Sequence, residues 1–226
     1  MNDKTKIAGL KNISQWKALK VQLQSAPTRQ SNWEKAFSEF LFQRITTRYF
    51  EPIDAIAKIS TRQGKGFSIV AIYCSLIEFF ETLKKGFDFK HPNYLDTGGQ
   101  LVRSTVILDR NGIGQPLNNK EIFVNFLTQN APFNKAFTNV LADSFYHNVR
   151  CSILHQAETQ LNWLIKDGTS KDEIIHTNSD NSIHLRWRPL KEAFHTYLVD
   201  TYKNQLLTDP NTQNNFIFKW DKICDI

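Results

Sequence analysis

The feature that most restricts the possible folds is an apolar helical stretch from about Phe67 to Lys85. Its apolar residues nearly encircle a helix, and a helix that is hydrophobic on all sides has to be covered by other parts of the chain. Gly86 follows at the position where a glycine commonly ends a helix. We therefore expect a central helix in a mainly α-helical protein.

The composition permits a large core around this helix. The chain has 226 residues, of which 41% are hydrophobic, including 17 Phe and 5 Trp. Proline and glycine are scarce, which favours long helices over a β-fold with many turns. We expect a single domain over residues 1–226, in which a helical arm (1–50) and a C-terminal hairpin with a helix (170–226) are added to a central bundle.

The other elements follow from apolar spacing and from residues that start or end helices. The expected helices lie within residues 1–28, over 33–45 behind a Ser31-Asn32 cap, over 53–59 after Pro52, over 118–129, over 134–166 and over 190–207. A loop is expected at 62–66 and a long irregular connection over 87–117. Short β-prone runs flank a turn at 178–181, which predicts a small β-hairpin near residues 173–187. The aromatic tail is expected to pack back on the body.

Charge, cysteines and hydropathy restrict the class of protein. The net charge of +6 is compatible with a polyanion such as nucleic acid as partner. The three cysteines form no CxxC pair, so they indicate neither a structural zinc site nor a disulfide framework. We find no signal peptide and no apolar run long enough to span a bilayer, and we expect a cytoplasmic protein without a membrane partner.

One segment of the predicted helix 134–166 indicates a specific chemistry. Arg150 is followed, after four residues, by His155. An arginine binds phosphate through charge and a two-pronged hydrogen bond, and a histidine exchanges a proton near neutral pH. The two residues would point roughly 140° apart on an ideal helix, so a long side chain, a kink or a second copy of the helix would have to bring them together.

Two other interpretations of this segment remain open. Arg150 and His155 are also compatible with solvated surface residues or local ion pairs. His147, Cys151 and His155 are spaced by four, and either adjacent pair could contribute to a zinc site. The outer two residues are roughly 12 Å apart along a helix and cannot share one ion. No third ligand is indicated, so we expect neither a metal nor a cofactor.

The run Phe145-Tyr146-His147-Asn148-Val149-Arg150-Cys151-Ser152-Ile153-Leu154-His155 resembles the signature of the HEPN superfamily, which is Arg, four to six residues, then His. The segment from Gly66 to Phe80 also resembles the early helix of such domains, which often supplies an acidic residue, here Glu78. The likeness covers about residues 60–165. It departs from the pattern at Cys151, where active members often have a polar residue.

The resemblance implies an up-and-down helical bundle that dimerises along the motif helices. It also implies metal-independent endoribonuclease activity, in a toxin or phage-defence role with a possible antitoxin partner. Arg150 would hold the scissile phosphate, His155 would act on the 2′-hydroxyl or the leaving oxygen, and Glu78 would orient Arg150. Imidazole catalysis of this kind contributes roughly 10²–10⁴-fold to a rate.

Four further residues are expected to contact RNA. His147 and Asn148 precede the motif arginine, and Arg186 and Arg188 flank Trp187 in a segment that could bind RNA by charge and stacking. An edge strand protected by charges is the alternative for that segment. For the whole protein, the alternatives are a non-catalytic HEPN-like module that binds RNA or a nucleotide, and a dimer interface stabilised by Arg150 and His155.

Overall fold

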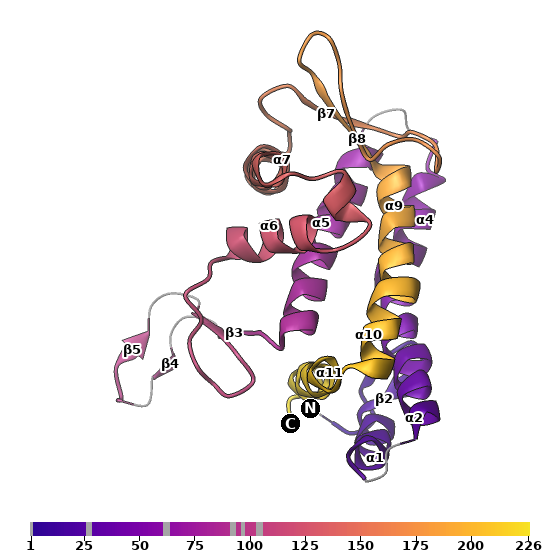
Figure 1. Ribbon diagram of the computed structural model, residues 1–226, viewed down its shortest axis with the longest axis vertical. Coiled ribbons are helices and arrows are strands. Elements are labelled where there is room, and N and C mark those ends of the chain that lie inside the picture. The colour runs from indigo at the N-terminus through magenta and orange to yellow at the C-terminus, as the bar shows by residue number, and fades with distance from the viewer. Residues whose placement is uncertain (1, 26–28, 61–63, 91–93, 96–97, 103–105) are drawn as a thin grey trace.

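A computed structural model describes residues 2–25, 29–60, 64–90, 94–95, 98–102 and 106–226 of the chain (Figure 1). Most of these residues are helical, and small sheets complete the fold. The expectation of a mainly α-helical protein is confirmed.

Helix α5 (Lys65–Lys85) lies at the centre of the molecule, as its all-round hydrophobicity predicted. Ten of its residues are buried, from Ile69 to Leu83. Gly86 ends the helix with a φ of 67°, and its N–H donates to the carbonyl of Thr82. Of the loop expected at 62–66, residues 62 and 63 lie outside the described part, and Lys65 and Gly66 already belong to α5.

By length and composition α5 would be sufficient to cross a bilayer, so the expectation that no segment is long enough is wrong. The helix has 21 residues, and 56% of its most apolar stretch is buried inside the protein. A mostly buried core helix meets the same criteria, and the absence of a membrane partner stays a prediction.

The N-terminal segment begins with a hairpin and not with a helix. Strands β1 (Lys6–Ala8) and β2 (Lys11–Asn12) pair around Gly9, whose φ is 52°. Helix α1 (Ile13–Gln24) then starts at Asn12, whose side chain accepts from the N–H of Gln15 in a reciprocal capping box. The early apolar residues at 7 and 10 fit a helical spacing, but this cap and turn place them before the helix.

One continuous helix replaces the two expected between residues 33 and 59. It consists of α2 (Gln30–Lys35), η1 (Ala36–Phe42), α3 (Gln43–Ile45), η2 (Thr46–Phe50) and α4 (Glu51–Ala57), in which η1 and η2 are π-helical. Its cap is Arg29, not Ser31 or Asn32. Pro52 does not begin a new helix, because it follows a π-helical turn whose wider path relieves the usual clash with the preceding turn.

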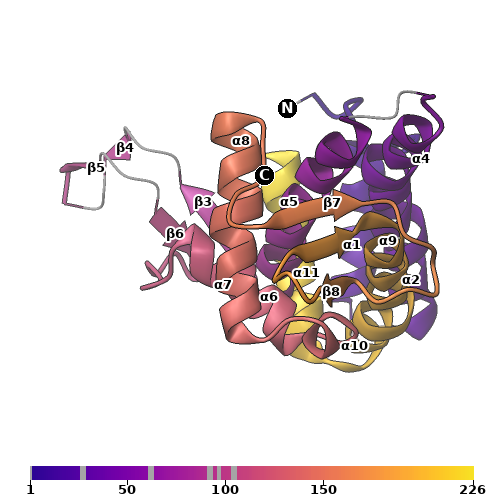
Figure 2. The same ribbon diagram turned by 90° about the horizontal axis from the view of Figure 1, so that it is seen from above.

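The connection after α5 is not fully irregular. Strand β3 (Asp88–Lys90) pairs with β6 (Val106–Leu108), and β4 (Tyr94–Leu95) pairs with β5 (Leu101–Val102), both antiparallel. The β4–β5 pair stands away from the helical body in both views (Figures 1 and 2). Phe87, Ile107 and Ile122 form a small separate hydrophobic cluster beside the β3–β6 pair.

Helix α6 (Asn119–Gln129) begins as predicted, at an Asn118 capping box completed by Glu121. After the short η3 (Phe133–Lys135), the segment with the Arg-His motif forms one continuous helix over residues 139–156, the motif helix. It consists of α7 (Asn139–Phe145), the π-helical η4 (Tyr146–Cys151) and α8 (Ser152–Gln156). This helix is seen end-on in Figure 1, so it crosses α5. Its expected continuation to residue 166 is wrong, because Ala157 takes a left-handed conformation (φ 55°) and ends it.

The chain then forms a three-stranded sheet at one end of α5. Strand β7 (Trp163–Lys166) runs parallel to β9 (Ile183–Arg186), which also pairs with antiparallel β8 (Ile175–Thr177). The predicted hairpin is therefore confirmed. Because β9 lies between the other two strands, the interpretation of this segment as an edge strand is wrong.

The C-terminal helices pack against the N-terminal segment. They are α9 (Trp187–Thr196), η5 (Tyr197–Tyr202), α10 (Lys203–Thr208) and α11 (Pro210–Cys224). The last expected helix begins at Trp187, before Pro189, and the tail is itself helical. Phe216 and Trp220 are fully buried, which confirms that the tail packs on the body. One hydrophobic cluster extends from Ile7 to Cys224.

Candidate functional site

Arg150 and Glu78 meet between the motif helix and α5. The Nε and Nη2 atoms of Arg150 donate to Oε1 of Glu78 at 3.1 and 2.8 Å. The two side chains are 17% and 21% exposed, so the pair is reachable from solvent without being fully hydrated. The predicted pairing of these residues is confirmed, whereas a role of the pair in catalysis stays a prediction.

The surroundings of Arg150 keep it charged. Burial of the guanidinium opposes the charge, but the Glu78 carboxylate outweighs this cost and raises the pKa of Arg150 above its ordinary value. The guanidinium carbon also lies 5.4 Å from the ring centre of Tyr146, in cation–π contact. Cys151, the residue that departs from the HEPN pattern, is partly exposed and holds a free thiol. A permanent, oriented cation therefore stands at this point of the helix.

His155 lies apart from this pair, in the last turn of α8. Its side chain is exposed. Within the described residues this side chain makes no hydrogen bond or ion pair, and Arg150 and Glu78 bond to each other without it. The structure thus brings two of the three predicted catalytic residues together and leaves the imidazole free in solvent.

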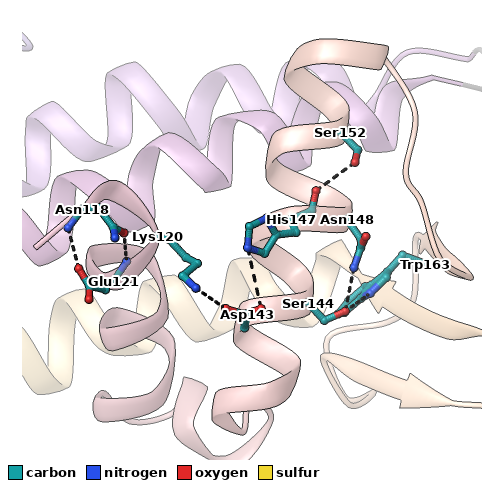
Figure 3. A network of polar contacts seen from close by, with 9 residues as sticks. All are labelled: Asn118, Lys120, Glu121, Asp143, Ser144, His147, Asn148, Ser152 and Trp163. Atoms are coloured by element: carbon teal, nitrogen blue, oxygen red, sulfur yellow. Dashed lines mark hydrogen bonds and ion pairs between the residues drawn. The ribbon is translucent and has the colours of Figure 1, made fainter. Parts of the chain in front are cut away.

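His147 belongs to an exposed polar network on the motif helix (Figure 3). Its Nε2 is 3.9 Å from Oδ2 of Asp143, whose Oδ1 lies 2.9 Å from Nζ of Lys120 on α6. The hydrogen bond from Lys120 lowers the pKa of Asp143, so this carboxylate stays charged. Lys120 and Asp143 were not predicted from the sequence, although the four-residue spacing of Asp143 and His147 indicates a contact on a helix.

Asn148 lies under the surface and connects the motif helix to the sheet (Figure 3). It is 9% exposed, and its Nδ2 donates to Oγ of Ser144, which also accepts from Nε1 of Trp163. The backbone carbonyl of Asn148 accepts from the backbone N–H of Gln160. The Asn148 amide therefore stabilises the packing of β7, and a contact of its side chain with RNA stays a prediction that requires this network to open.

Arg186 and Arg188 lie on two different elements. Arg186 ends β9, whereas Arg188 is in the first turn of α9, where its Nη2 is 3.7 Å from Oδ2 of Asp167. Trp187 is 2% exposed and donates to the same carboxylate through Nε1. The expected stacking of Trp187 on RNA is therefore wrong, because the indole is buried and its polar atom is paired.

The possible metal ligands do not converge. Among the described residues, no group of three or more His, Cys, Asp or Glu side chains is placed to hold a metal ion. The expectation of a metal-free, cofactor-free protein stays a prediction.

The fold and the Arg150–Glu78 pair define a mainly helical protein in which a paired arginine stands on a helix that crosses the central helix. Searches of protein-family models, of curated proteins and of solved structures found no match to the chain.

Proposed function

We propose that the protein is a metal-independent endoribonuclease of HEPN type that acts as a homodimer in the cytoplasm. The observation that carries this proposal is the Arg150–Glu78 pair, with His155 exposed on the same helix. The resemblance of residues 60–165 to the HEPN superfamily supports the bundle architecture and a toxin or phage-defence role with an antitoxin partner.

Arg150 has the donors that a phosphate requires. Glu78 accepts from two of the five N–H groups of the guanidinium, which leaves donors for phosphate oxygens. A carboxylate that fixes the guanidinium reduces the conformational entropy lost when substrate binds. In the proposed reaction, the 2′-oxygen attacks phosphorus, the 5′-oxygen leaves, and a cyclic phosphate forms.

His155 would transfer the proton in this reaction. The 2′-hydroxyl has to lose a proton and the leaving oxygen has to gain one, and an imidazole can serve either step near neutral pH. A dimer that pairs the motif helices would supply two imidazoles for the two steps. DNA lacks the attacking hydroxyl, so the proposed activity is specific to RNA.

Incubation of the purified protein with end-labelled RNA, with and without EDTA, tests the proposal. We expect cleavage that is unaffected by EDTA, that yields 2′,3′-cyclic phosphate ends and that is lost in Arg150→Ala and His155→Ala. His195→Ala is a matched control, since His195 is an exposed histidine of another helix. Cleavage that needs a metal, or that persists in His155→Ala, would contradict the proposal.

A non-catalytic RNA-binding module is the second candidate. Cys151 favours it, because a thiol is a weaker hydrogen-bond donor than the polar side chain often found after the motif arginine. In this case the protein would bind RNA without cleaving it, and Arg150→Ala would weaken the binding. If Arg150 and His155 only stabilise a dimer, their substitution would change the oligomeric state and leave RNA binding intact.

A further inference from the structure

A cleft lies beside the motif helix, between η4, the first turn of α6 and strand β6. It has a volume of about 490 Å³ and is lined by Ile107, Leu117, Asn118, Asn119, Lys120, Tyr146 and His147. Sites for small ligands usually have volumes of roughly 300–1,000 Å³. The cleft therefore has room for a ligand the size of a nucleotide.

The apolar wall of the cleft leads directly to Arg150. Tyr146 contributes its ring to this wall, and the ring packs edge-to-face against Phe123, with ring centres 5.5 Å apart. The same ring contacts the Arg150 guanidinium, at 5.4 Å, and the His147 imidazole, at 5.3 Å. A planar ligand in the cleft would thus lie next to the group proposed to bind the scissile phosphate.

The polar wall offers a positive charge and amide groups. Lys120 is 40% exposed, and it stands in the first turn of α6, where backbone N–H groups have no partner within the helix. The helix dipole adds positive potential at this end. Asp143 and the capping carboxylate of Glu121 counter part of this charge, but Asp143 is itself bound by Lys120.

We propose that this cleft is a subsite for one nucleotide of a single-stranded RNA, with the base on Tyr146 and the phosphate at Lys120. Aromatic rings bind unpaired bases by stacking. The side-chain amide of Asn119 and the Nδ2 group of Asn118, whose Oδ1 caps α6, can bond base edges. The Arg150 guanidinium carbon lies 5.4 Å from the centre of the Tyr146 ring, a spacing that suits neighbouring units of one strand. This assignment rests on the proposed RNA substrate.

Binding of a fluorescent single-stranded RNA with 2′-O-methyl groups tests the subsite without cleavage. We expect Lys120→Ala to weaken binding at least fivefold and to lower the slope of log affinity against log salt by about 0.7. Tyr146→Leu, which keeps an apolar side chain against Phe123, should weaken binding at least fivefold by removing the stacking ring. Lys17→Ala is the matched control, because Lys17 is 46% exposed and paired with Asp3.

The outcomes separate the subsite from the nuclease. Unchanged RNA binding in both Lys120→Ala and Tyr146→Leu would overturn the subsite, whether or not the protein cleaves RNA. Binding that depends on Lys120 in a protein that cleaves no RNA would support the subsite and contradict the nuclease. Free AMP or UMP that binds as tightly as the RNA strand would overturn the assignment of the cleft to a strand.

Discussion

Two glutamates of α5 have opposite surroundings, although they are three residues apart. Glu78 faces the Arg150 guanidinium and is 21% exposed. Glu81 is 2% exposed, and its Oε2 has no hydrogen-bond partner among the described residues. Burial raises the pKa of Glu81, and the nearby Lys85 and Lys84 reduce this effect only in part. Identical side chains on one helix therefore make different contributions to stability.

We expect the Glu78–Arg150 pair to show measurable coupling in a double-mutant cycle with Glu78→Ala and Arg150→Ala. Residues in direct contact typically couple by about 0.5–3 kcal/mol, and partial burial of both groups strengthens their attraction. Urea unfolding of the four proteins measures the value. The exposed Lys17–Asp3 pair is the control, with an expected coupling of about 0–1 kcal/mol. Coupling no larger than that of the control would show that the pair contributes little to folding.

Glu81→Gln should stabilise the protein increasingly as the pH rises. The raised pKa means that the folded protein holds this proton more tightly than the unfolded chain, whose ordinary value is 4.5. Stability is therefore lost as the pH rises above about 4.5 and through the folded pKa, and a glutamine avoids this loss. Thermal melts of both proteins from pH 4.5 to 8 check the trend, with the exposed Glu34→Gln as control. A constant difference in Tm would contradict it.

At the scale of elements, local signals predicted the helices that carry their own end residues. Helix α5 ends at Gly86 and α6 starts at Asn118, both as expected. The end of the motif helix could not be predicted in this way, because no glycine or proline marks it and Ala157 takes the left-handed conformation. Strand β7 depends on a partner twenty residues later, since Trp163 pairs with Ile183.

The candidate site was only partly accessible from the sequence for a similar reason. The resemblance to HEPN domains predicted the Glu78–Arg150 pair, which joins residues 72 positions apart. The neighbouring cleft combines Lys120 of α6 with Tyr146 of η4, and no motif connects them. Their proximity follows from the packing of α6 against the motif helix, which periodicity does not specify.

Two glycine substitutions distinguish backbone strain from crowding at the end of α5. Both residues have a positive φ, of 67° and 77°, so a side chain strains the backbone at either position. Gly86→Ala should destabilise the protein more than Gly112→Ala, because a side chain at Gly86 is crowded as well. A Cβ at Gly86 would clash with Oδ1 of Asn215, whereas no atom of the described residues lies within 4 Å of one at Gly112. We expect about 1–2 kcal/mol for Gly112→Ala and a larger loss for Gly86→Ala, measured by urea unfolding. Equal losses would mean that Asn215 moves without cost.

At the scale of the whole molecule, the two ends of the chain share one part of the core. Trp16 of α1 packs against Trp220 of α11, with ring centres 5.6 Å apart, and its Nε1 donates to Asp221. Phe40 contacts the same two indoles. This cluster belongs to the continuous core that also contains Trp163 of β7. The helical arm predicted over residues 1–50 is therefore packed into the body through its apolar face.

A continuous core predicts that the chain unfolds as one cooperative unit. Trp163→Ala should lower the free energy of unfolding by about 3–5 kcal/mol, because the indole is 2% exposed and its removal leaves a cavity. The same change should lower the protection of α1 amides against hydrogen exchange, although Trp163 lies on β7 in another part of the core. Exchange measured by NMR under conditions in which it reports equilibrium opening tests this coupling.

Trp220→Ala provides the comparison, because this substitution acts directly at α1. In a single cooperative unit, each variant lowers the protection of α1 and of α5 by the same free energy as it lowers global stability. If residues 1–50 instead formed a separately folding arm, Trp163→Ala would leave the protection of α1 unchanged. The slowest-exchanging amides of α1 therefore decide between one domain over the whole chain and a body with an independent arm.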